Sequence, residues 1–207
     1  PNKRDKLVDE LAASNAYLNK WSHWYLDMSR SVGGIVGESG RNLYYEYIYD
    51  ALQYNRPYNE VVTDLLTTKA FSNWYVAPAT YLIRSRILAP VNTEVVHEDT
   101  ADEMMISSFK HFLGINLQCV SCHDGARHLE KLNLWLTSKT RQQFWQQAAF
   151  FGKTRVWRRV NVNPGRDEYA IDDTAGGYDA RAGSVVRLKR TGKGFVEPAF
   201  ILTGDPE

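Results

Sequence analysis

Both cysteines of this 207-residue chain fall within one pentapeptide, Cys119-Val120-Ser121-Cys122-His123, which has the C-x-x-C-H spacing. This spacing is typical of a c-type haem attachment site. Two thiols at this separation can each bond one vinyl group of a haem, and the imidazole of His123 can then reach the iron from the same side. A chain with this motif must fold around a flat, apolar macrocycle. The motif therefore predicts one covalently bound haem c, held by Cys119 and Cys122, with His123 as an iron ligand.

Three other readings of the two cysteines fit less well. A thioredoxin-like C-x-x-C needs a neighbouring βαβ pattern, whereas the flanks of this motif look helical. A structural zinc site needs four ligands, which usually arrive as two paired clusters, and the chain has no second pair of cysteines. A simple disulfide would leave the adjacent His123 unexplained.

The composition limits the class of protein. A chain of 207 residues can form one substantial domain, and its net charge of +1 gives no electrostatic reason to expect a nucleic-acid or anionic-membrane partner. No apolar run is long enough to span a bilayer. The chain starts at Pro1 rather than Met, and bacteria attach haem to thiols outside the cytoplasm. We therefore expect part of a longer, exported protein, which is periplasmic or extracellular.

Apolar periodicity predicts a mainly α-helical fold with a small β-rich C-terminal part. The expected domains are a helical c-type haem domain at 1–152 and a β-rich extension at 153–207 packed on it, with a solvated acidic loop at 167–183. Gly114 is expected to cap the helix that precedes the motif. The expected helices are 3–13, 15–28, 43–52, about 61–66, 79–88, 98–113 and 140–151, and the expected strands are 154–160, 184–188 and 199–202.

The second iron ligand has several candidates. A chain reversal at Gly114 would bring His97, Met104 and Met105 within reach of a haem that lies against the helix 98–113, and His128 is only five residues beyond His123. We expect His97, then Met104, then His128, and an open iron site stays as an alternative. The list of expected cofactor-binding residues is completed by Arg127, the arginine nearest the motif in sequence, as a partner for a haem propionate.

Several segments resemble the planctomycete-type cytochrome c family. Residues 112–124 are similar to its haem segment, Leu7–Leu11 to its opening helix, Tyr25–Arg30 to its W-L-D-x-x-R signature with tyrosine in place of tryptophan, Asn55–Tyr58 to an N-x-P-Y element, and 198–204 to the exit from the domain. One departure matters: many members read C-H-D-H, whereas this chain has Asp124-Gly125 after His123. The role of that second histidine is therefore not carried over, although His128 lies close by.

The resemblance implies a haem domain of a larger exported bacterial protein whose central domain has no assigned function. The expected activity is electron transfer to a redox partner protein or to a neighbouring haem domain of the same polypeptide. Two alternatives stay open. One is a haem enzyme of the peroxidase or oxidoreductase kind with an open distal iron face, and the other is a binding module in which the haem is structural.

Overall fold

The computed structural model describes residues 2–89, 96–160 and 167–203. The chain forms two compact units, which we describe separately. Unit 1 comprises Pro1–Arg84 and Arg158–Ala170, and unit 2 comprises Ser85–Trp157 and Ile171–Glu207. The predicted architecture, mainly α with a small β part, is confirmed. Segments of the expected extension 153–207 belong to both units, and its division from 1–152 as a separate domain stays a prediction.

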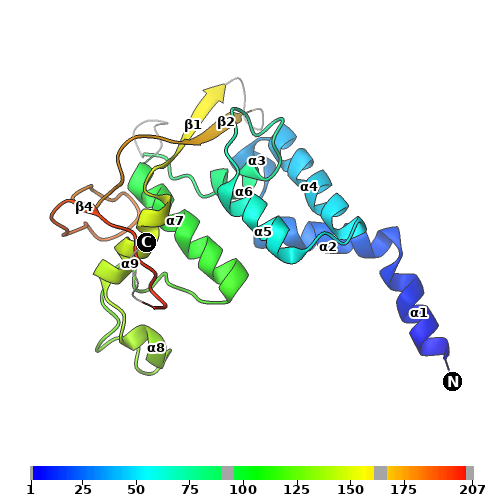
Figure 1. Cartoon of the computed structure of the whole chain (residues 1–207), viewed down its shortest axis with the longest axis horizontal. Helices are drawn as coiled ribbons and strands as arrows, with labels where there is room; N and C mark the ends of the chain where they lie inside the picture. Colours follow the sequence, from blue (N-terminus) through cyan, green and yellow to red (C-terminus); the bar gives the residue numbers. More distant parts are fainter. Residues whose placement is uncertain (1, 90–95, 161–166, 204–207) are drawn as a thin grey trace. The chain divides into compact units, whose positions relative to one another are not determined.

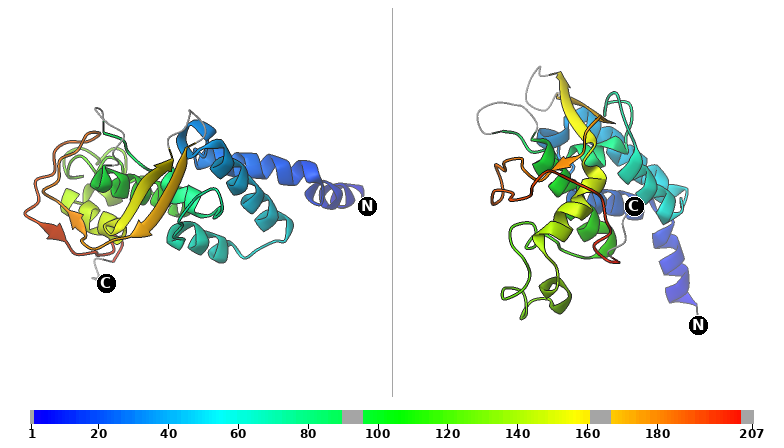
Figure 2. Two further views of the ribbon diagram at one scale, coloured as in Figure 1. Left: turned by 90° about the horizontal axis from the view of Figure 1, so that it is seen from above. Right: turned by 60° about the vertical axis from the view of Figure 1, so that its left-hand side comes forward.

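Unit 1 contains the helices drawn in blue to cyan in Figure 1. They are α1 (Lys3–Ala12), α2 (Asn15–Met28), α3 (Gly33–Val36), α4 (Glu38–Gln53), α5 (Tyr58–Thr67) and α6 (Ala79–Ile83). Helix α2 packs on α4, and α5 packs on α6. Helix α1 extends from the start of α2 away from α4, α5 and α6 (Figures 1 and 2), and it buries none of its side chains against the residues that the structure describes. The core of unit 1 therefore begins with α2.

Unit 2 is built around α7 (His97–Ser108), which packs against α9 (Arg141–Ala148). A π-helical turn, Phe109–Leu113, continues α7 and ends at Gly114, whose φ of +68° is in the left-handed region that glycine adopts without strain. Short helix α8 (Leu134–Thr137) precedes α9, and a 3₁₀ turn, Ala149–Phe151, follows it. The buried apolar side chains of these elements make one hydrophobic core.

The strands form two small sheets. Strand β1 (Thr154–Val160) pairs with β2 (Glu168–Asp173), and the two lie side by side in both views of Figure 2. Strand β3 (Tyr178–Asp179) pairs in antiparallel register with β4 (Phe195–Val196), with Tyr178 opposite Val196. The predicted strand at 154–160 is confirmed.

Other boundaries differ from those expected. The segment 184–188 is irregular rather than a strand, and 199–202 contains only an isolated bridge at Ala199. The expected loop 167–183 contains β2 and β3. The helix expected at 79–88 ends at Ile83, and the α-helical part of 98–113 ends at Ser108. In 184–188, the side chain of Arg187 makes long-range polar contacts, which local periodicity does not reveal.

Candidate functional site

The C-x-x-C-H motif forms a compact turn in unit 2. The amides of Cys122 and His123 both donate to the carbonyl of Cys119, at 3.2 and 3.3 Å. Val120 and Leu117 are fully buried in the hydrophobic core of the unit and hold the turn against it. Cys119 is exposed, Cys122 is half-buried, and both thiols are free. The turn therefore buries its apolar members and leaves its sulfur atoms accessible.

The imidazole of His123 is oriented by its own backbone. Its Nδ1 lies 2.8 Å from the carbonyl oxygen of Asp124, which can only accept a hydrogen bond. This contact selects the tautomer with the proton on Nδ1 and leaves the Nε2 lone pair available for a metal. The ring of His128 lies 4.6 Å from that of His123, centroid to centroid. The structure thus brings these two predicted residues together.

A cavity of about 820 Å³ opens beside His123. Its volume falls within the range of about 300–1,000 Å³ that is usual for small-molecule and cofactor sites. The indole of Trp145 and the side chains of Phe195 and Lys193 contribute to its wall. Two aromatic residues and one lysine are therefore among the residues that line the same cavity as His123. The full lining is His123, Asp124, Thr140, Arg141, Gln142, Trp145 and residues 191–196.

Helix α9 begins at this cavity because Thr140 caps it. The Thr140 hydroxyl accepts from the amide of Gln143, and the Gln143 side chain accepts from the amide of Thr140, which is a complete capping box. The next residue, Arg141, donates from its backbone amide to Asp124 Oδ1 (2.7 Å), and its guanidinium lies over the ring of Trp145. Burial lowers the pKa of Arg141 below its ordinary value. The start of α9 is thereby tied to the end of the motif.

Gly125 follows the motif at a point of close backbone approach. A Cβ on Gly125 would lie 1.8 Å from the carbonyl oxygen of Leu136, and its amide donates to the carbonyl of Lys139 at 2.8 Å. A side chain at this position would force the segment that leads into α9 to move. The close approach of the Leu136 carbonyl therefore favours glycine at position 125.

The other predicted residues lie elsewhere in unit 2. His97 begins α7, half-buried, and its Nδ1 is buried without a hydrogen-bond partner in the described ranges. Met104 and Met105 are fully buried on α7, and Met105 packs in the same core as Val120. Arg127 is exposed with a left-handed φ of 71°. None of these four lines the cavity beside His123.

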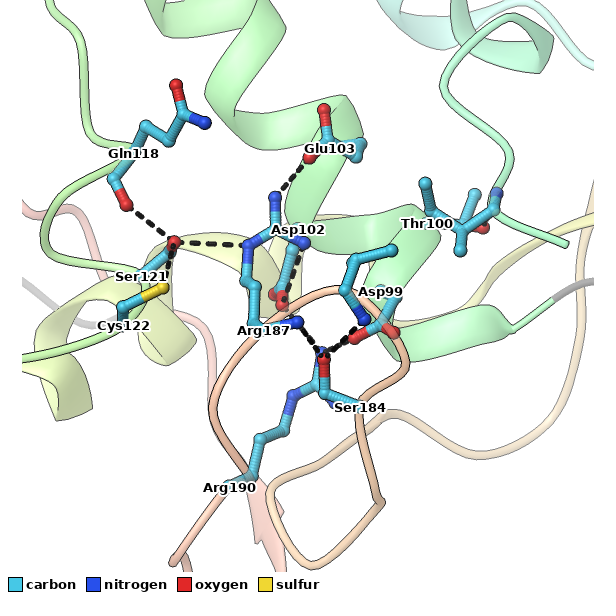
Figure 3. Close-up of polar contacts among 12 residues, drawn as sticks. Asp99, Thr100, Asp102, Glu103, Gln118, Ser121, Cys122, Ser184, Arg187 and Arg190 are labelled. Atoms are coloured by element: carbon cyan, nitrogen blue, oxygen red, sulfur yellow. Dashed lines mark hydrogen bonds and ion pairs between the residues drawn. The ribbon is translucent and has the colours of Figure 1, made fainter. Parts of the chain in front are cut away.

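Sequence reasoning missed a cluster of buried charges on α7. Arg190 Nη2 donates to Asp99 Oδ1 (2.7 Å) and to Asp102 Oδ2 (2.6 Å), and the Tyr178 hydroxyl donates to Asp102 Oδ1 (2.6 Å). Burial raises the pKa of Asp102 above its ordinary value, and the nearby Arg190 and Arg187 oppose that effect. Figure 3 shows Asp99, Asp102 and Arg190 between α7 and residues 184–190, which we call the strap.

The sequence reveals the carboxylates of this cluster but not the arginines that pair with them. The sequence shows three carboxylates close together, Asp99, Asp102 and Glu103, and all three lie on α7. Their partners lie more than eighty residues away in the strap. Periodicity along a chain does not connect positions so far apart.

Within residues 2–89, 96–160 and 167–203, no group of three or more His, Cys, Asp or Glu side chains could hold a metal ion by itself. In the same described part of the chain, no helix has both the length and the apolar character needed to cross a membrane.

Comparison with known proteins identifies one family. The family model described as PSCyt2, protein of unknown function (DUF1549), matches residues 1–156. No curated protein and no solved structure matches the chain. The matched region includes the C-x-x-C-H turn, Gly125 and α9, and it ends before the strap.

Proposed function

The chain belongs to the PSCyt2 family of proteins of unknown function, and from this premise we propose that unit 2 binds one haem c covalently and transfers electrons. The observation that carries the proposal is the turn 119–123. It combines two free thiols at C-x-x-C spacing with a histidine whose Nδ1 is engaged by a carbonyl, so that Nε2 is free. The resemblance to planctomycete-type cytochromes c supports the same function.

The residues present fit a haem. The thiols of Cys119 and Cys122 would each add across one vinyl group, so that the S–H bond and the vinyl double bond are replaced by a thioether and a C–H bond. His123 would hold the iron through Nε2, while its Nδ1–H stays bonded to Asp124. Trp145 and Phe195 offer apolar surface in the adjoining cavity. When bound, the haem supplies one-electron exchange between Fe(III) and Fe(II).

The propionates and the second axial position need further groups. Arg127 and His128, just beyond the motif, are our candidates for contact with the haem edge, and Lys193 adds a cation on the cavity wall. For the second iron ligand we keep His97 first, then Met104, then His128, with Met105 or an open site as the remaining alternatives. The proposal also includes an exported location, periplasmic or extracellular, and a redox partner protein or neighbouring haem domain of the same polypeptide.

Covalent attachment is tested first. We would express the chain with an export signal in a bacterium that matures c-type cytochromes and extract it with acidified organic solvent. We expect the haem to stay with the wild-type protein and to be absent from a Cys119→Ala, Cys122→Ala double variant. A Cys119→Ala single variant should keep one thioether. Extraction of all the colour from the wild-type protein, or no haem in it at all, would refute the proposal.

The role of His123 and of the iron is tested next. His123→Ala should change the oxidised and reduced absorption spectra, whereas His23→Ala, on α2 of unit 1, should leave them unchanged. Carbon monoxide then separates electron transfer from catalysis. A reduced protein that does not bind it has two protein ligands on the iron and suits electron transfer. Rapid binding indicates an open site and favours the enzyme alternative.

A further inference from the structure

The strap is fastened to α7 at two points. Near its start, the amide of Val185 donates to Asp99 Oδ2 at 2.8 Å. At its end, Arg190 bonds Asp99 and Asp102, and its side chain is only 1% exposed while theirs are 0% and 2% exposed. Arg190 Nε also donates to the Tyr178 hydroxyl at 2.8 Å. Buried charges with full hydrogen bonding are costly to separate, so these contacts fix the course of the strap.

Arg187 reaches from the middle of the strap to the cysteine motif. Its Nε donates to Ser121 Oγ at 3.1 Å, and its Nη2 is paired with Glu103. Its Nη1 lies 4.0 Å from Asp102 Oδ2 and makes no hydrogen bond within the described residues. The side chain is 6% exposed. Figure 3 shows Arg187 between α7 and the turn that carries Ser121 and Cys122. The arginine thus links the helix, the strap and the motif.

Arg141 closes the same connection from α9. Its Nε donates to the Ser121 carbonyl at 3.0 Å, its Nη1 donates to the Lys189 carbonyl at 2.8 Å, and its Nη2 donates to the Leu188 carbonyl. One guanidinium therefore joins the backbone of the motif to the backbone of the strap. Its nitrogen atoms are used for this purpose rather than for a ligand in the cavity.

Ser121 is the point at which both arginines meet. It stands between the two cysteines and is 1% exposed. Its hydroxyl accepts from Arg187 and donates to the Gln118 carbonyl at 2.6 Å, while its own carbonyl accepts from Arg141. Its Oγ lies 3.8 Å from Cys122 Sγ. Any movement of Ser121 would move both neighbouring peptide units and hence the cysteine and histidine that follow.

We propose that Arg187 and Arg141 are positioning residues that clamp the strap onto Ser121 and hold the 119–123 turn in one geometry. The part of this proposal that concerns a bound haem, namely that the clamp fixes the plane of His123 and adds positive charge near the iron, rests on the proposed function. Arg187 and the rest of the strap lie outside residues 1–156, which the family model matches, whereas Ser121 and Arg141 lie inside them.

The clamp is tested first in the haem-free chain by amide hydrogen exchange. The amides of Cys122 and His123 report on the turn because they bond the Cys119 carbonyl. In Arg187→Gln they should exchange about tenfold faster than in the wild type, since a hydrogen bond from a charged group is lost. Ser121→Ala should speed them in the same direction. The control is Arg181→Gln, which breaks the exposed ion pair with Asp179 and should leave the turn unchanged.

Two further results decide the outcome. If the amides of α7 and α9 also lose their protection in Arg187→Gln, then this variant has unfolded unit 2. In that case Ser121→Ala becomes the test of the clamp, because it changes no charged residue. Wild-type exchange of the turn in Ser121→Ala would overturn the clamp in that case. Wild-type exchange in both variants with α7 still protected would overturn it directly.

The haem-loaded protein gives a second, independent readout. Arg187→Gln should lower the midpoint potential, because loss of a nearby positive charge favours Fe(III), whereas Arg187→Lys should restore most of it. An unchanged potential in Arg187→Gln would refute the part that concerns the haem. If the wild-type chain takes up no haem, the proposed function fails, and the hydrogen-exchange result still judges the clamp.

Discussion

Gly125 is the residue at which the site has least room for a side chain. Because a Cβ there would meet the Leu136 carbonyl at 1.8 Å, we expect Gly125→Ala to lower the free energy of unfolding by about 1–3 kcal/mol. Gly183→Ala, in the same unit but with no atom near its Cβ, is the control. Urea denaturation measures both. Equal stability of the two variants would contradict the role given to this contact.

His97 should make the stability of the haem-free chain depend on pH. Burial, and after it the nearby Arg155, lower its pKa below the ordinary 6.5. The folded chain then binds fewer protons than the unfolded chain, so the stabilisation is complete above pH 6.5 and is lost as the pH falls through the folded pKa. His97→Gln should therefore lose less stability than the wild type between neutral and acidic pH. Parallel curves of unfolding free energy against pH would disprove this.

Single functional residues could be predicted from the sequence where they are neighbours in the chain. Cys119, Cys122 and His123 are contiguous, so their spacing alone predicts what they can bind. Arg187 and Arg190 were not recognised, because an arginine in an irregular segment looks the same whether it faces solvent or a buried carboxylate. Arg127 was chosen as a partner for a haem propionate only because it is near the motif in sequence, and this assignment stays a prediction.

Among the elements, α9 depends on Thr140, the residue that caps its N-terminus. Thr140→Ala removes the hydroxyl of the capping box and should lower the free energy of unfolding by about 1 kcal/mol. The matched control is Thr63→Ala in the interior of α5, where the hydroxyl only bonds the carbonyl of Asn59 and the change should stay within about 0.5 kcal/mol. Thermal unfolding compares them. A cap variant as stable as the control would show that α9 is held by its packing alone.

Helix α1 should be the least protected helix of unit 1. Its Leu7, Val8 and Leu11 side chains are each more than half exposed, and it has only ten residues. Isolated helices shorter than about 12–15 residues are marginal in water. We expect its amides to exchange far faster than those of α4, which buries Tyr44 and Ile48. Equal protection of the two helices would mean that α1 is covered in solution.

The start of a helix was predictable where a capping residue directly precedes a helical repeat of apolar side chains. Helix α2 begins at Asn15 as expected, after Ser14 caps it, although its aromatic residues stay largely exposed. The strand expected at 184–188 failed for a physical reason. Its alternating residues suit a strand, but Val185 bonds Asp99 and Arg187 turns toward Ser121 and Glu103, so polar contacts fix the backbone instead of a ladder.

For the whole molecule, the family-matched region should not suffice for unit 2 to fold. A chain that ends at residue 156 lacks Tyr178, Arg187 and Arg190, so Asp99 and Asp102 would lose their buried partners at a cost of about 3–5 kcal/mol or more. We expect α7 and α9 to lose hydrogen-exchange protection in this chain. A chain that lacks residues 1–13 is the control and should keep it. Wild-type protection of α7 in the shorter chain would contradict this expectation.

The long sequence separation between Ser121 and Arg187 also means that the two residues are synthesised at different times. The serine leaves the ribosome 66 residues before the arginine. At about 5–20 residues per second, the residues of the cysteine motif are made roughly 3–13 s before those of the strap. Under the proposed export, an attachment enzyme would meet the thiols only outside the cytoplasm, where a chain that crosses the membrane from its N-terminal end presents Cys119 and Cys122 before Arg187 and therefore unclamped. Variants of Arg187 should therefore acquire as much haem as the wild type and differ only afterwards, in how tightly the finished site is held.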